Sequence, residues 1–225
     1  MKEFDKVIGY KSIKIELERI CDWMINPEKY KKLGVNLPGG LLLYGEPGVG
    51  KTLFAGCFIE AAKRKAYICR KNEPNGDFVK TIKKTFDDAL GNAPSIVVLD
   101  DLDKFANEDE DHKNAEEFIT VQSCIDDIKG KDVFVLATAN DLTNFPRSIL
   151  RAGRFDKSIK VNNPTGEDCV KIVRYYLSQK KNVKDIDARE IARILNGKSC
   201  AELETVVNEA GIYAGFQNKR IYRHG

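Results

Sequence analysis

The sequence of 225 residues predicts a doubly wound α/β fold, in which helices cover both faces of a parallel sheet, followed by a small helical region. Near-continuous apolar runs at 95–99 and 132–137 suit strands that are buried on both faces. Helical patterns alternate with such runs along the chain. After 163–166, which reads Asn-Pro-Thr-Gly, strand signals stop and only helical patterns follow.

The individual elements follow from these patterns. Strands are predicted at 41–44, 66–69, 95–99, 132–137 and 157–161. Helices are predicted after the first strand, around 114–128, and at 166–180, 187–196 and 199–217. We therefore expect a large α/β domain at 1–163 and a helical lid at 164–225, with Pro164 and Gly166 marking the hinge.

A glycine-rich stretch directly after the first strand carries the clearest functional signal. It reads Gly45-Glu46-Pro47-Gly48-Val49-Gly50-Lys51-Thr52, runs on into Leu53, and fits the phosphate-loop pattern G-x-x-x-x-G-K-[ST]. Glycines let consecutive backbone N–H groups point at an anion, and the following helix adds its positive dipole. Lys51 is expected to neutralise the β and γ phosphates of ATP, and Thr52 to offer a hydroxyl to Mg²⁺.

Polar residues at the ends of two later strands complete the predicted chemistry. Asp100 is placed to hold Mg²⁺, and Asp101 to polarise the attacking water. Asn140 could reach between the γ phosphate and that water. Further on, Arg151 and Arg154 could reach the γ phosphate of a neighbouring subunit and stabilise the charge of the transition state.

Composition limits the class of protein. The net charge of +3 arises from 37 basic and 34 acidic residues, so no nucleic-acid footprint is expected. The six cysteines form no C-x-x-C pair and are interpreted as reduced and mostly buried. Apolar runs are too short to span a bilayer, and the charged N-terminus is not a secretory signal, so a cytoplasmic or cytosol-facing location is expected.

Four further segments carry a resemblance to a known family. They lie at 7–9 with 14–17, at 30–34 leading into 38–42, at 150–156 and at 206–210. Together with the phosphate loop, they make the chain similar to the ATPase module of the AAA+ superfamily, most closely that of the FtsH-type membrane-anchored zinc proteases. The resemblance implies a five-stranded parallel sheet with a helical lid, working as a homo-hexameric ring on protein substrates. It also implies that ATP lies at subunit interfaces, with Ile8 and Gly9 near the adenine and Arg151 and Arg154 donated in trans.

The chain departs from the family pattern at three places. Asp101 stands where the family has glutamate, and Cys200 stands where the lid pattern has glycine. The polar segment 72–77 replaces the family's aromatic substrate-gripping loop. Phe78 is the nearby aromatic, but its helical spacing with Ile82, Phe86 and Ala89 favours a core position.

The peptidase half of such a protease is not found in this sequence. It has two histidines and no H-E-x-x-H pattern, so we interpret the chain as an ATPase piece of a longer protein, whose membrane anchor would also lie elsewhere. Two alternatives remain open. One is a nucleotide-dependent assembly or binding module with weak hydrolysis, favoured by Asp101. The other is a nucleic-acid motor or clamp loader, which the near-neutral charge disfavours.

Overall fold

The computed structural model describes residues 1–35, 38–71, 77–105, 115–143, 145–146, 148–150, 153–181 and 186–217. Within these ranges the chain forms a five-stranded sheet of β1 (Gly40–Tyr44), β2 (Lys65–Arg70), β3 (Ser95–Asp100), β4 (Val133–Ala139) and β5 (Lys157–Lys160). The strands are ordered β2-β3-β4-β1-β5, and every pairing is parallel. The predicted α/β fold with a five-stranded parallel sheet is confirmed.

The three central strands, β3, β4 and β1, are apolar because helices cover the sheet on both sides. Every residue of β3 and β4 is buried. Within β1, Leu41 and Leu43 pack into one hydrophobic cluster and Leu42 into another, as the alternation of side chains along a strand requires. The register sets Tyr44 opposite Ala139, and Leu99 opposite Ala137. The carboxyl ends of β1, β4 and β3 therefore lie side by side at one edge.

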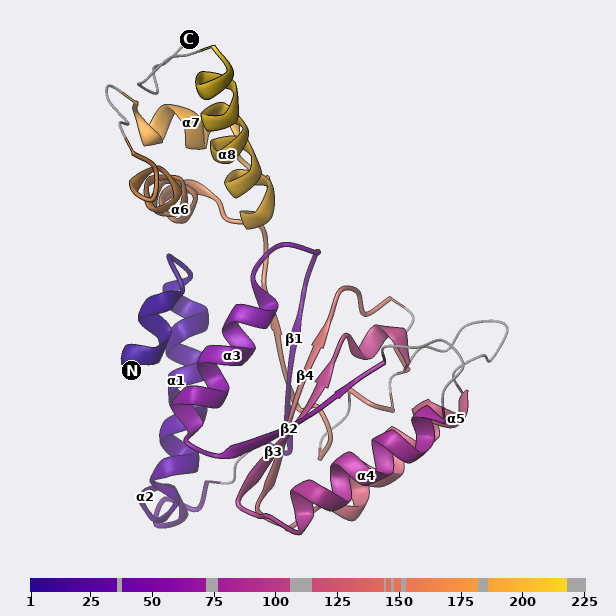
Figure 1. Cartoon of the computed structure of the whole chain (residues 1–225). Helices are drawn as coiled ribbons and strands as arrows, with labels where there is room; N and C mark the ends of the chain where they lie inside the picture. The colour runs from indigo at the N-terminus through magenta and orange to yellow at the C-terminus, as the bar shows by residue number, and fades with distance from the viewer. Residues whose placement is uncertain are drawn as a thin grey trace.

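Two groups of helices form the outer layers. Figure 1 shows α1 (Lys11–Ile25), α2 (Pro27–Lys31) and α3 (Lys51–Ala62) on one side of the sheet. On the other side lie α4 (Phe78–Leu90) and α5 (Ala115–Asp127). Two short 3-10 helices, η1 (Lys2–Lys6) and η2 (Leu102–Lys104), precede α1 and follow β3.

Helix α4 settles the position of Phe78. Asp77 caps the helix by accepting a hydrogen bond from the Lys80 N–H, and the helix buries one face against the sheet. The Phe78 side chain is buried on that face and meets Phe105 edge-on, with ring centroids 4.9 Å apart. The predicted core position of Phe78 is confirmed, whereas residues 72–76 lie outside the described part of the chain.

The helical region comes last and sits beyond one end of the sheet (Figure 1). It consists of α6 (Gly166–Ser178), α7 (Ala188–Ile194) and α8 (Cys200–Phe216), close to the three predicted helices. Cys169 and Val173 of α6 and Leu203 of α8 are buried in the same cluster as α1 and α3. The helical region thus shares a continuous apolar core with α1 and α3, which cover one face of the sheet.

Two further findings concern the described residues as a whole. All six cysteines are free, and five of them are buried, as predicted. No described helix combines the length and apolarity that crossing a bilayer requires.

Candidate nucleotide-binding site

The glycine-rich loop connects β1 to α3, as predicted. Gly45 follows β1 with φ of +150°, and a Cβ built on it would lie 2.1 Å from the Val161 carbonyl oxygen, so no larger residue fits. Gly50 is the N-cap of α3 at φ +98° and makes no side-chain cap. The first N–H groups of α3 therefore face the loop, which is the arrangement that binds an anion.

Lys51 is held between the loop and the end of β4. Its Nζ donates to the carbonyl oxygens of Gly45 at 2.7 Å and Glu46 at 2.9 Å, and to Asn140 Oδ1 at 3.0 Å. The side chain is buried, which lowers the pKa of the ammonium, while three nearby aspartates oppose that shift. Lys51 is thus a positive charge fixed at the mouth of the loop.

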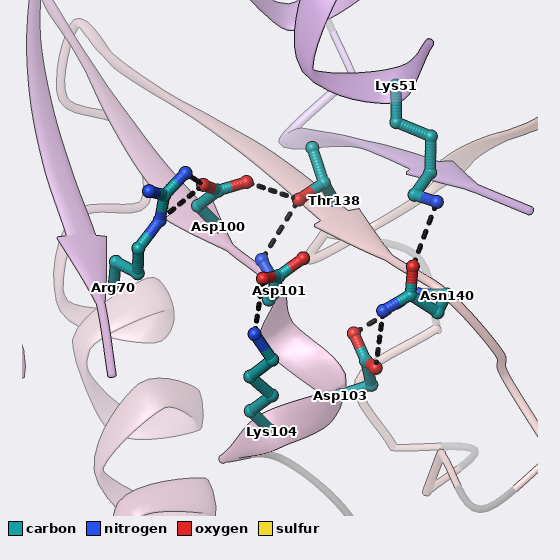
Figure 2. Close-up of polar contacts among 8 residues, drawn as sticks. All are labelled: Lys51, Arg70, Asp100, Asp101, Asp103, Lys104, Thr138 and Asn140. Atoms are coloured by element: carbon teal, nitrogen blue, oxygen red, sulfur yellow. Dashed lines mark hydrogen bonds and ion pairs between the residues drawn. The ribbon is translucent and has the colours of Figure 1, made fainter. Parts of the chain in front are cut away.

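The two aspartates at the end of β3 point in different directions (Figure 2). Asp100 is buried; its Oδ1 accepts from the Thr138 hydroxyl at 2.7 Å, and its Oδ2 accepts from Arg70 Nε at 2.7 Å. Asp101 has a left-handed backbone with φ of +54°. This conformation turns the chain, so that the Asp101 N–H donates to the Thr138 hydroxyl and its carboxylate pairs with Lys104 at 2.7 Å.

Asn140 is oriented by contacts on both ends of its amide. Its Oδ1 accepts from Lys51, and its Nδ2 donates to Asp103 Oδ2 at 3.2 Å. The Asn140 backbone N–H donates to Asp103 Oδ1 at 3.1 Å. Sequence reasoning missed Asp103, although its place three residues after Asp100 on a short 3-10 turn was a usable signal.

Lys51, Asp101 and Asn140 line a cavity of about 820 Å³. Of the predicted site residues, those that line it are Ile8, Pro47, Gly48, Val49, Gly50, Lys51, Thr52, Leu53, Asp101 and Asn140. Gly9, Glu46 and Asp100 are not among the lining residues. Gly9 instead packs against α6 of the helical region, because a Cβ built on it would lie 2.9 Å from Asp168 Oδ1. The structure thus brings most of the predicted set together around a single space.

The helical region closes one side of this cavity. The Ala201 N–H at the start of α8 donates to the Gly48 carbonyl oxygen at 3.1 Å, and the Cys200 thiol lies 3.7 Å from the Val49 carbonyl oxygen. A capping box between Ser199 and Glu202 fixes the first turn of α8. Cys200, the residue that departs from the family's lid pattern, therefore lies directly against the phosphate loop.

Two residues, Tyr10 and Asn163, link the part of the chain around the sheet to this helical region. Tyr10, which follows Gly9, donates its hydroxyl to the Asn162 carbonyl oxygen at 2.9 Å and its N–H to Asp168 Oδ2 at 3.0 Å. Asn163 Nδ2 donates to Glu46 Oε2 at 2.8 Å and to the Gly197 carbonyl oxygen at 3.0 Å. Glu46 thus contributes to the joint between loop and helical region rather than to the cavity wall. Burial raises the pKa values of both Tyr10 and Cys200.

The structure describes one of the two predicted arginines, Arg154. Arg151 lies outside the described residues. Arg154 is 4% exposed; its Nε and Nη2 donate to Asp126 on α5 at 3.2 and 2.6 Å, and its Nη1 donates to the Ser148 carbonyl oxygen at 2.9 Å. Its charge is therefore bound within its own chain, and a role in trans stays a prediction.

The side-chain oxygens beside the cavity are of the chemical type that binds a magnesium ion. Carboxylate and hydroxyl oxygens are the hard ligands that Mg²⁺ prefers, and it usually binds through one or two of them together with phosphate oxygens. Thr52 and Asp101 line the cavity, while Asp100 does not line it and accepts a hydrogen bond from Thr138 on the neighbouring strand. The chain thus supplies suitable ligands next to the phosphate loop.

Comparison with known proteins agrees with this geometry. A sequence model described as "ATPase family associated with various cellular activities (AAA)" matches residues 41–163, more than half of the chain. The chain is 31% identical to "ATP-dependent zinc metalloprotease YME1 homolog" of Caenorhabditis elegans over 96% of its length, and 32% identical to "ATP-dependent zinc metalloprotease FtsH" of Ureaplasma parvum over 93%. It is 33% identical to "ATP-dependent zinc metalloprotease YME1L1" of Mus musculus over 97% of its length. The matches cover 31%, 30% and 32% of these relatives. The chain therefore belongs to the AAA family of ATPases.

Proposed function

We propose that the chain binds ATP with Mg²⁺ and hydrolyses it, as the ATPase part of an FtsH-like ATP-dependent protease. One observation carries the proposal: Lys51, Asp101 and Asn140 line a single cavity with the phosphate loop and the start of α8. In the proposed working form, six copies assemble into a ring in the cytoplasm or on a cytosolic membrane face. The ring unfolds protein substrates for a peptidase encoded in another part of the same protein.

The loop binds the triphosphate in this proposal. Backbone N–H groups at the start of α3 face the anion, and Lys51 exchanges its carbonyl contacts for phosphate oxygens. The adenine lies toward Ile8, which lines the same cavity as the loop, together with Tyr176. Gly9 contributes indirectly, because it lets Asp168 and Tyr10 approach each other.

Thr52 and Asp100 are the proposed ligands of Mg²⁺, directly or through water. When bound, this ion neutralises the charge that develops on the β and γ phosphates. Asp101 polarises a water, and Asn140 orients that water toward the γ phosphorus. A bond forms from the water oxygen to phosphorus while Asp101 accepts a proton from that water, and the bond to the bridging oxygen breaks. ADP and inorganic phosphate then leave, and Asp101 returns the proton to solvent.

The neighbouring subunit supplies the last positive charge. Arg151 follows directly after the described stretch 148–150, and we assign it the role of stabilising the transition state in trans. Arg154 was predicted for the same role, but it would first have to leave Asp126. We therefore assign Arg154 to holding this segment in place against α5.

The first test combines binding and turnover. Calorimetric titration with ADP in Mg²⁺ should show one site per chain, and ATP turnover per chain should rise with protein concentration as rings assemble. Lys51→Met should abolish the phosphate-dependent binding, whereas Lys65→Met, on the surface of β2, should leave it unchanged. Absence of nucleotide binding by the unmodified chain would refute the proposal.

A second candidate is a nucleotide-dependent assembly module with weak hydrolysis. It is supported by Asp101, whose short side chain is paired with Lys104 at 2.7 Å. Displacing a catalytic group by about 1 Å can cost about 100-fold in rate. A large gain in turnover for Asp101→Glu would favour this candidate, whereas equal or lower turnover would show that aspartate is already competent.

A further inference from the structure

Arg70, at the edge of the sheet, contacts the carboxylate of Asp100, a proposed ligand of Mg²⁺. It is the last residue of β2, the edge strand, and lies opposite Asp100 in the parallel register. Its Nε donates to Asp100 Oδ2 at 2.7 Å, and its Nη2 contacts the same oxygen. The Arg70 side chain is 51% exposed, whereas that of Asp100 is 8% exposed. A surface guanidinium thus neutralises a buried carboxylate (Figure 2).

These contacts use both acceptor positions of Asp100 Oδ2 and one of the two on Oδ1. A carboxylate oxygen offers about two lone pairs to donors. Oδ2 receives two guanidinium N–H groups, and Oδ1 receives the Thr138 hydroxyl. Lys51, the other cation of the site, directs its hydrogen bonds to Gly45, Glu46 and Asn140 instead. Arg70 is therefore the cation that contacts Asp100 among the described residues.

A divalent cation and a guanidinium cannot use the same lone pairs, and their like charges repel at such short range. Because Arg70 is half exposed, it can turn into water without leaving a buried charge. Asp100 has no such freedom, since it ends a strand that is buried along its whole length.

We propose that Arg70 is an internal competitor of the divalent metal, so that metal binding at the nucleotide site releases Arg70 from Asp100. The proposal rests on the proposed nucleotide site and adds a regulator to it. By linkage, whatever holds Arg70 on Asp100 weakens metal binding, and whatever draws Arg70 away strengthens it. Since Arg70 ends β2, a change at that edge of the sheet is communicated to the metal position.

The test measures metal affinity rather than turnover. The full chain, saturated with ADP, is titrated with Mn²⁺, and free Mn²⁺ is followed by electron paramagnetic resonance. Arg70→Met should tighten Mn²⁺ binding by up to about fivefold, the upper end of the range expected for a partly exposed ion pair. Lys65→Met removes the same charge from the other end of β2 and should leave Mn²⁺ affinity unchanged. Arg70→Lys, which keeps the charge without the forked contact, should fall between.

Unchanged Mn²⁺ binding in Arg70→Met would overturn the inference, because Arg70 would then not compete with the metal. Weaker Mn²⁺ binding would also overturn it, because Arg70 would then help to hold Asp100 in place for the metal. Equal tightening in Lys65→Met would also overturn it, because a general charge effect would then suffice. Failure of the unmodified chain to bind ADP would instead contradict the proposed function. The two failures are therefore distinguishable.

Discussion

Replacing Asp126 with alanine should lower the free energy of unfolding more than replacing its partner Arg154 with methionine. The reason is their exposure: the Arg154 side chain is 5% exposed and that of Asp126 is 38% exposed. Without Asp126, the guanidinium retains the Ser148 carbonyl contact but remains a buried charge. Without Arg154, the carboxylate retains Lys129 at 2.6 Å and part of its contact with water.

The expected magnitudes follow from this asymmetry. Leaving a buried charge without its counter-ion costs about 3–5 kcal/mol, so Asp126→Ala should fall in that range. Arg154→Met loses charge-assisted hydrogen bonds but strands no buried charge, and should cost about 1–3 kcal/mol. The double variant should be no less stable than Asp126→Ala, because it removes the stranded charge as well. Lys129→Met, which removes the exposed partner of the same carboxylate, should cost at most about 1 kcal/mol.

Equilibrium unfolding in urea measures these differences. Fluorescence of Trp23 and far-ultraviolet circular dichroism should give coincident transitions before free energies are compared. The reasoning is refuted if Arg154→Met costs as much as Asp126→Ala, or if the double variant shows the sum of the two single effects. Either result would mean that the ion pair is not the contact that holds the segment before β5 onto α5.

Two further predictions concern the phosphate loop and the first turn of α8. Gly45→Ala should abolish ADP binding and destabilise the chain, because its Cβ would lie 2.1 Å from the Val161 carbonyl oxygen; Gly56→Ala, with open space in α3, should instead stabilise it by about 0.5–1 kcal/mol in urea unfolding. Normal binding by Gly45→Ala would contradict the loop geometry. Hydrogen bonds from the Ser199 N–H and from Lys198 lower the pKa of Glu202 to about 2. Because the pKa of Glu202 is lower in the folded state than in the unfolded state, its ionised carboxylate stabilises the fold at pH values above the unfolded-state pKa. This stabilisation is lost as pH falls toward 2. Glu202→Gln should therefore flatten the decline of the urea midpoint below about pH 4.5; an unchanged decline would show that the capping box does not titrate as described.

Features encoded locally were predictable from the sequence. The strands were found because burial on both faces leaves an apolar run, as in β3 and β4. The phosphate loop was found because its glycines and Lys51 follow one another in sequence. Phe78 was placed in the core because its spacing with Ile82 and Phe86 matches one helix face.

Features that depend on register between strands were not predictable. Arg70 meets Asp100 only because β2 and β3 pair with these two residues opposite each other, and a shift by one residue would turn Arg70 to the other face. Thr138 enters the site for the same reason, since β4 lies between β3 and β1. The burial of Arg154 depends on Asp126, which is far away in sequence and carries no motif.

The same cross-strand contacts affect how the site works. Lys51, Asp100, Asp101 and Asn140 each have partners within the chain, so under the proposed function a nucleotide and its metal exchange bonds at this site and do not simply add new ones. The net free energy of such an exchange is the difference between two sets of hydrogen bonds and ion pairs, and is smaller than either set. Nucleotide affinity should then depend on Arg70, Lys104 and Asp103 as well as on the motif residues they contact. The partners lie outside the phosphate-loop motif, and they give this chain a way to adjust its nucleotide and metal affinity without changing the motif itself.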